Sequence, residues 1–105
     1  MITKSDQKIV VQVDAELKPL VPGYLEHRLR DTGLIRDALT RKDFELIEHL
    51  AHILKGSGGG YGFDFISEIG DQMEERAQSG DSEAVFQCVN ELALYLERVE
   101  VIYEP

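Results

Sequence analysis

A histidine, a lysine and a glycine lie within five residues of one another in the segment HLAHILKGSGGGYGFDF, residues 49–65. The apolar residues of this segment recur at helical spacing, and at about 100° per residue His52 and Gly56 fall one turn apart on the opposite face. Lys55 lies beside that exposed face. Imidazole is mostly neutral near pH 7 and can accept a phosphoryl group, and an ammonium can balance the charge of phosphate oxygens. The three residues therefore predict an exposed nucleophile that a large partner can approach.

A metal site and a nucleotide-binding loop are the other sites that this segment suggests, and both fit it poorly. His49 and His52 could bind a metal with Glu45 and Glu48, but these side chains point outward, whereas metal ligands in helix bundles project inward. The glycines between residues 56 and 62 follow an expected helix rather than a strand, and the lysine precedes them, so they do not form a nucleotide-binding motif. We interpret them as sites of close helix packing.

The elements that must position these residues are four amphipathic helices. Apolar spacing predicts them at residues 22–40, from 43 through the site segment, at 63–79 and at 81–102. Asp43 and Asp81 can each cap a helix start, because a carboxylate accepts a hydrogen bond from a free N–H of the first turn. The connections at 40–42 and 79–81 are short, which favours antiparallel neighbours.

The apolar faces of the first and last helices are read directly from the spacing. The first helix is expected to bury Val21, Leu25, Leu29, Ile35 and Leu39. Gly33 weakens this helix by about 1 kcal/mol relative to alanine. The last helix carries a long apolar stripe made of Val85, Cys88, Val89, Leu92, Tyr95, Leu96, Val99 and Ile102.

The N-terminal part divides into an arm and the start of the folded domain. Residues 1–13 are expected to form a flexible arm. Asp14 precedes AELKPL and predicts a short capped helix, so the domain is expected to span residues 14–105. The resulting fold class is all-α: an antiparallel up-and-down four-helix bundle with a short extra N-terminal helix.

Length and charge limit the possible partners. The chain has 105 residues, enough for one domain, and its net charge of −9 argues against nucleic-acid binding. Residues 1–55 are neutral overall, so the acidic excess lies in residues 56–105.

No apolar run is long enough to cross a membrane, and the N-terminus lacks the pattern of a secretory signal. Cys88 has no second cysteine to pair with. A cytoplasmic setting is expected.

The run from His52 to Ser57 resembles the H-x-[LI]-K-G-[SA] signature of the histidine phosphotransfer (HPt) domain. The family places a glycine and a hydrophobic residue ten positions after the histidine, where this chain has Gly62 and Phe63. The similarity continues through Ile66, Ile69, Met73 and Glu74. The resemblance implies a four-helix bundle, which the periodicity predicts independently.

The resemblance also implies a function and roles for the site residues. His52 would be phosphorylated on Nε2, Lys55 would stabilise the phosphate, and Gly56 would leave room for the partner. The implied protein is a phosphoryl carrier of a two-component phosphorelay without independent enzymatic turnover. It would accept the group from a receiver-domain aspartate or a histidine kinase and pass it to another receiver. Some members carry a glutamine where this chain has Glu74.

Partners and assembly are expected to follow the same family. Docking of a receiver is expected to involve Leu17, Leu20, Val21 and Gly59. No cofactor is expected on this chain, since Mg²⁺ would belong to the receiver domain. A monomer without nucleic-acid or membrane partners is expected. The alternative function is a phosphorylation-independent adaptor that binds a response-regulator receiver domain.

Overall fold

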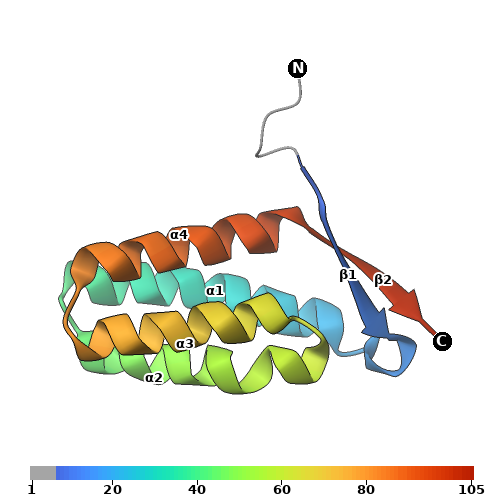
Figure 1. Cartoon of the computed structure of the whole chain (residues 1–105), viewed down its shortest axis with the longest axis horizontal. Coiled ribbons are helices and arrows are strands. Elements are labelled where there is room, and N and C mark those ends of the chain that lie inside the picture. Colours follow the sequence, from blue (N-terminus) through green and yellow to red (C-terminus); the bar gives the residue numbers. More distant parts are fainter. Residues whose placement is uncertain (1–6) are drawn as a thin grey trace.

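Four helices form the body of the fold, joined at alternate ends so that consecutive helices run antiparallel (Figure 1). The computed structural model describes residues 7–105. The helices are α1 (Val21–Thr40), α2 (Phe44–Ser57), α3 (Asp64–Gln78) and α4 (Ser82–Arg98). Two strands, β1 (Ile9–Asp14) and β2 (Val99–Glu104), and two short 3₁₀ turns, Ala15–Leu17 and Gly59–Tyr61, complete the described elements. The prediction of four helices is confirmed, and the bounds of α1, α2 and α3 agree with it within a few residues.

The predicted aspartate caps begin two of these helices. Asp43 Oδ1 accepts a hydrogen bond from the N–H of Leu46 at 3.1 Å, and Asp81 Oδ1 accepts one from the N–H of Ala84 at 3.0 Å. Each bond satisfies a backbone donor that has no partner within its helix. The caps therefore fix where α2 and α4 start, and with them the register of every side chain that follows.

The core fills the space between the four helices. Its largest fully buried side chains include Ile35, Ile47, Leu54, Phe63, Ile66, Met73 and Leu92. Burying each such side chain contributes about 1.5–3 kcal/mol relative to leaving it exposed. Leu29 was predicted to join them but is 54% exposed. The buried face of α1 is set by Tyr24 and Ile35, and Leu29 falls about 120° away from it around the helix.

The end of the last helix differs from the prediction. Val99 and Ile102 were placed in a helix, but α4 ends at Arg98 and both residues lie in β2. The sequence VEVIYE alternates, and its β-branched residues favour extended backbone over helix. The strand turns Val99, Val101 and Tyr103 toward the bundle.

The N-terminal segment pairs with this strand. β1 runs parallel to β2, with Ile9 opposite Val99 and Asp14 opposite Glu104. A flexible arm had been predicted for residues 1–13; residues 1–6 lie outside the described part, and from Ile9 the chain is a strand. Val13 is only 2% exposed. Parallel strands need a long crossover, and here the whole bundle supplies it.

The short N-terminal helix is replaced by a single 3₁₀ turn, Ala15–Leu17. Asp14 caps it as predicted, its Oδ1 accepting from the N–H of Glu16 at 2.9 Å. Pro19 has no N–H to donate to the carbonyl of Ala15, so an α-helical turn cannot continue.

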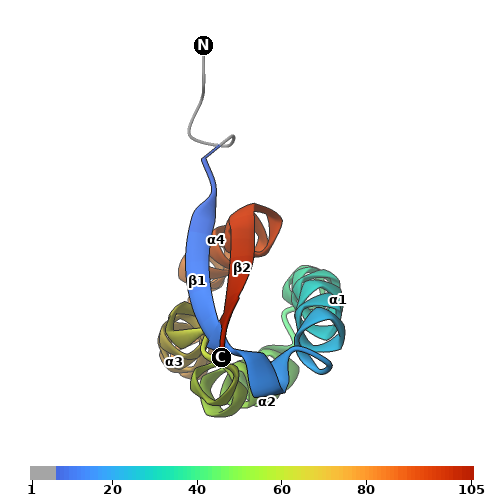
Figure 2. The same cartoon turned by 90° about the vertical axis from the view of Figure 1, so that its right-hand side faces the viewer.

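The strand pair lies across the end of the bundle where α1 begins and α4 ends (Figures 1 and 2). There it meets the connection between α2 and α3. Gly62 in this connection has a φ of +91°, and a Cβ on it would lie 3.3 Å from Cγ2 of Val13. The strands therefore support the loop that joins the two helices of the site. Within residues 7–105, none of the helices is long and apolar enough to cross a membrane.

The buried tyrosine of α4 gives a prediction about alkaline stability. Tyr95 stacks on Phe65 with ring centroids 4.6 Å apart, and its burial, with smaller effects of Asp64 and Tyr24, raises its pKa to about 12. An unfolded chain ionises tyrosine near pH 10, so stability should fall between about pH 10 and pH 12, by about 1–2 kcal/mol. We expect Tyr95→Phe to lose less stability than the wild type over this pH range, because phenylalanine has no hydroxyl to ionise. Urea unfolding at about pH 8 and pH 11 would show it; an identical loss in the variant would contradict the assignment.

Candidate functional site

His52 presents one ring nitrogen to solvent and the other to a carboxylate. It lies on α2 with its side chain 71% exposed, and its Nδ1 is 2.9 Å from Oε2 of Glu74 on α3. An ionised carboxylate can only accept a hydrogen bond, so Nδ1 carries the proton and donates it. In the neutral ring the lone pair is then on Nε2. The contact fixes both the tautomer and the direction in which the free nitrogen points.

Lys55 lies one turn after His52 and shares the same carboxylate. Its Nζ is 3.0 Å from Oδ1 of Asp71 and 3.4 Å from Oε1 of Glu74. These carboxylates raise the pKa of Lys55, Asp71 more than Glu74. The lysine is therefore a full positive charge at neutral pH. Glu74 connects the imidazole and the ammonium through its two oxygens.

A glycine in α3 allows these contacts. A Cβ on Gly70 would lie 2.5 Å from the backbone N of Lys55 and 2.9 Å from the carbonyl O of Ala51. Only a residue without a side chain permits this approach of α3 to α2. Glu74 follows Gly70 by one turn and is thereby brought within hydrogen-bond distance of His52. Sequence reasoning missed Gly70 and Asp71, although an isolated glycine within a helical pattern is a signal of close packing.

Gly56 leaves the space beside the imidazole open. It lies one turn beyond His52 on the same exposed face, and a Cβ there would meet no atom within 4 Å. The structure of the domain itself therefore does not require glycine at this position. Gly56 therefore leaves the surface beside His52 open to a partner.

The glycines after α2 divide into packed and open positions. A Cβ on Gly58 would lie 2.6 Å from the backbone N of Ser67 and 2.7 Å from the carbonyl O of Phe63. The N–H of Gly59 donates to Oγ of Ser67 at 2.8 Å. The close-packing interpretation is confirmed at Gly58, but it is wrong at Gly56 and Gly60, where a Cβ would meet no atom within 4 Å. The tight connection holds the C-terminal turn of α2, which carries the lysine, against the start of α3.

A polar cluster fixes the same turn of α2 to α1. The hydroxyls of Tyr24 and Ser57 are 2.8 Å apart, and Arg28 Nη1 donates to Ser57 Oγ at 3.3 Å. The Ser57 hydroxyl therefore links α2 to two side chains of α1. Arg28 Nε is 2.9 Å from Oδ2 of Asp31, and both side chains are 13% exposed. Desolvation raises the pKa of Asp31 despite the arginine beside it.

The residues predicted to dock a partner are not equally accessible. Leu20 is 56% exposed and borders a shallow groove of about 440 Å³ that also includes Gly23, His27 and Ser57. Val21 is 1% exposed, because the first turn of α1 directs it into the core, so its side chain is removed from the docking set. Leu17 is partly buried and Gly59 is exposed.

An acidic hollow lies beside His52. A hollow of about 490 Å³ is lined by His49, His52 and three glutamates, Glu45, Glu48 and Glu74. Among residues 7–105, no group of three or more histidine, cysteine, aspartate or glutamate side chains is arranged to hold a metal ion. Positive charge near the imidazole comes from Lys55, which contacts the same glutamate as His52. The arrangement offers a neutral nucleophile, one positive charge and open access, without a metal centre of its own in the described part.

The comparison with known families agrees with this geometry. The family model of the Hpt domain matches residues 24–101, which include all four helices in most of their length and every residue of the site. No curated protein and no solved structure gives a significant match. Since the match covers most of the chain, the chain belongs to the Hpt domain family.

Proposed function

We propose that this chain is a phosphoryl carrier in a two-component phosphorelay, with His52 as the acceptor. Hpt domains are phosphocarrier modules of phosphorelay signalling rather than enzymes. The observation that carries the assignment to His52 is the hydrogen bond between Nδ1 and Glu74 at 2.9 Å on a side chain that is 71% exposed. It leaves Nε2 as a nucleophile directed at solvent, with Lys55 beside it.

The transfer step needs no proton to leave first. The Nε2 lone pair attacks the phosphorus of a receiver's aspartyl phosphate, the N–P bond forms and the bond to the aspartate oxygen breaks. The ring becomes cationic while Nδ1–H continues to donate to Glu74, and Lys55 balances charge on the phosphoryl oxygens. In onward transfer a second receiver's aspartate attacks the phosphorus and Nε2 leaves. Mg²⁺ would be held by the receiver, and no cofactor by this chain.

A receiver would approach over Gly56 toward α1. Ile53 is 39% exposed on α2, and Leu20 is 56% exposed on α1. Gly23 and His27 lie beside Leu20 in a groove that Arg28 also lines, and these residues form the proposed docking surface. Apolar side chains at the centre of a contact surface are typical of transient protein interfaces. This surface replaces the predicted set that contained Val21.

The adaptor function is favoured by one observation. Glu45, Glu48 and Glu74 surround His52, and carboxylates oppose the accumulation of a dianionic phosphoryl group. In that case the domain would bind a receiver without accepting phosphate. The two functions differ in whether binding depends on chemistry at His52.

Transfer from a labelled receiver separates these functions. The receiver, carrying aspartyl [³²P]phosphate, is mixed with the chain, and the product is tested in acid and in alkali. A carrier acquires label that is acid-labile and alkali-stable, as phosphohistidine is. An adaptor binds the receiver in a titration but acquires no label. Absence of both label and binding with a panel of receivers would contradict both functions.

Two open glycines provide a matched test of the approach surface. Gly33 in α1 and Gly56 in α2 are both helical, and a Cβ on either meets no atom within 4 Å. We expect leucine at either position to raise the free energy of unfolding by about 0.5–1 kcal/mol, since glycine is the poorer helix former. Only Gly56→Leu should slow label uptake, by about tenfold or more, which corresponds to about 1.4 kcal/mol. Equal uptake by both variants would contradict a receiver approach over Gly56.

A further inference from the structure

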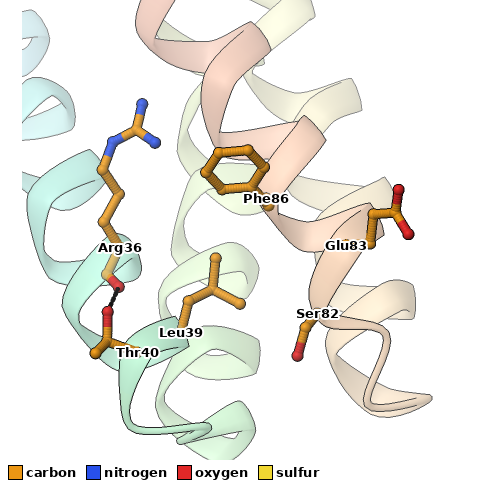
Figure 3. A pocket seen from close by; sticks show the side chains of 6 residues that line it. All are labelled: Arg36, Leu39, Thr40, Ser82, Glu83 and Phe86. Atoms are coloured by element: carbon orange, nitrogen blue, oxygen red, sulfur yellow. Dashed lines mark hydrogen bonds between the residues drawn. The ribbon is translucent and has the colours of Figure 1, made fainter.

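An exposed aromatic side chain lies on the side of the bundle formed by α1 and α4. Phe86 is 52% exposed and stands next to Leu39 in a groove of about 530 Å³ (Figure 3). The other residues that line the groove are Arg36, Thr40, Ser82 and Glu83. An exposed phenylalanine at the centre of an apolar groove is unfavourable in water and is typical of a contact surface.

This groove is separate from the phosphoryl site. His52 and Glu74 join α2 and α3, whereas the groove lies between α1 and α4. Seen along the bundle in Figure 2, α1 and α4 lie on the side opposite to the outer faces of α2 and α3. Docking of a receiver at His52 therefore leaves Phe86 uncovered and does not explain it.

Two charges at the groove lack partners of opposite sign. Arg36 Nη1 donates to the neutral Oδ1 of Asn90 at 2.8 Å. Within residues 7–105, neither Arg36 nor Glu83 has an oppositely charged atom within 4 Å. The other three arginines in and next to α1 all form such pairs: Arg28, Arg30 and Arg41. Within the described residues, Arg36 and Glu83 thus remain available for ion pairs with another molecule.

The order of these groups makes the groove complementary to itself. In Figure 3, Phe86 and Leu39 lie between Arg36 on α1 and Glu83 near the start of α4. A two-fold axis through the apolar pair would place each Arg36 opposite the Glu83 of the other copy. Most soluble homodimers use such an isologous contact, in which the same patch serves on both subunits.

We propose that the α1–α4 groove binds a second copy of this chain, with Phe86 and Leu39 at its centre and Arg36 paired with Glu83 across the two-fold axis. The contact is limited in size, so a reversible dimer with a Kd of about 10–100 μM is expected. Both His52 side chains remain on outer surfaces of the dimer. One particle then presents two acceptor histidines. The proposal does not depend on phosphoryl transfer.

Sedimentation equilibrium from about 5 μM to 1 mM protein at physiological ionic strength tests it. The wild type should pass from the mass of one chain to that of two. Phe86→Glu should shift the transition to at least about 30-fold higher protein concentration, since loss of a central aromatic weakens association by about that factor or more. Leu94→Glu is the matched control, because Leu94 is 41% exposed on the same helix outside the groove. This control should dimerise like the wild type.

Charge reversal tests the pairing itself. Arg36→Glu and Glu83→Arg should each weaken the dimer by about tenfold, and the double variant should restore it, as expected for a direct pair. A wild type that stays monomeric at 1 mM would overturn the proposal, as would a dimer unaffected by Phe86→Glu. Loss of the dimer in both single variants without recovery in the double variant would overturn the assigned pairing. Circular dichroism of each variant confirms that it is folded.

Discussion

His52→Gln is expected to acquire no label from a phosphorylated receiver, whereas His49→Gln is labelled like the wild type. Glutamine has a similar length and polarity but no nucleophilic nitrogen, so no N–P bond can form. The side chain is 71% exposed, and exposed substitutions of this kind change stability by less than about 0.5 kcal/mol. Failure to label therefore cannot be attributed to unfolding. The measurement is the acid-labile label per chain after transfer.

His49 is the appropriate control because it is also an exposed histidine of α2 at the same hollow, whereas the hydrogen bond to Glu74 is made by His52. It lies three residues earlier on α2, is exposed and borders the same acidic hollow. The hydrogen bond to Glu74 is made by His52, and Lys55 lies next to that pair. Label that persisted in His52→Gln and disappeared in His49→Gln would move the acceptor to His49. Label lost in both variants would indicate a defect in receiver binding, which the titration would show.

The helices could be predicted because their signals are local. Asp43 and Asp81 cap their helices where the sequence indicated. The strands could not be predicted, because β1 and β2 pair residues about ninety positions apart, for example Ile9 with Val99. The apolar residues after α4 also continue its helical stripe by chance, so a helix and a strand fit the same positions.

The site was predictable on α2 and not between the helices. A helical wheel was enough to place His52 and Gly56 on an exposed face and Lys55 beside them. It carries no distances to another helix, so Glu74 was identified only as a departure from the family and Asp71 not at all. Because α3 approaches α2 closely at Gly70, the carboxylate of Glu74 comes within hydrogen-bond distance of His52 Nδ1. Val21 was expected both in the core, from its spacing, and in the docking surface, from the family resemblance. The structure places it in the core, with 1% exposure.

In the proposed transfer the carboxylate of Glu74 supports the reacting His52 ring, so its removal is expected to slow uptake. We expect Glu74→Ala to reduce the single-turnover rate of labelling by about 30- to 100-fold. A hydrogen bond to a charged group contributes about 1.5–3 kcal/mol, and 1.4 kcal/mol corresponds to a factor of ten. Glu74→Gln keeps an acceptor oxygen without the charge, so a loss of about tenfold is expected. Lys55 keeps its contact with Asp71 at 3.0 Å in both variants.

The sign of this effect follows from the position of the charge in the ring. As the N–P bond forms at Nε2, the imidazole becomes cationic, so the contact between Nδ1–H and an anionic carboxylate grows stronger in the transition state. Repulsion between Glu74 and the phosphoryl group is weaker, because that group attaches to the nitrogen on the far side of the ring. Glu75→Gln is the matched control, an exposed neighbour on α3, and should label like the wild type. Faster labelling or longer-lived phosphohistidine in Glu74→Gln would show that repulsion dominates, and would favour the adaptor function over the carrier.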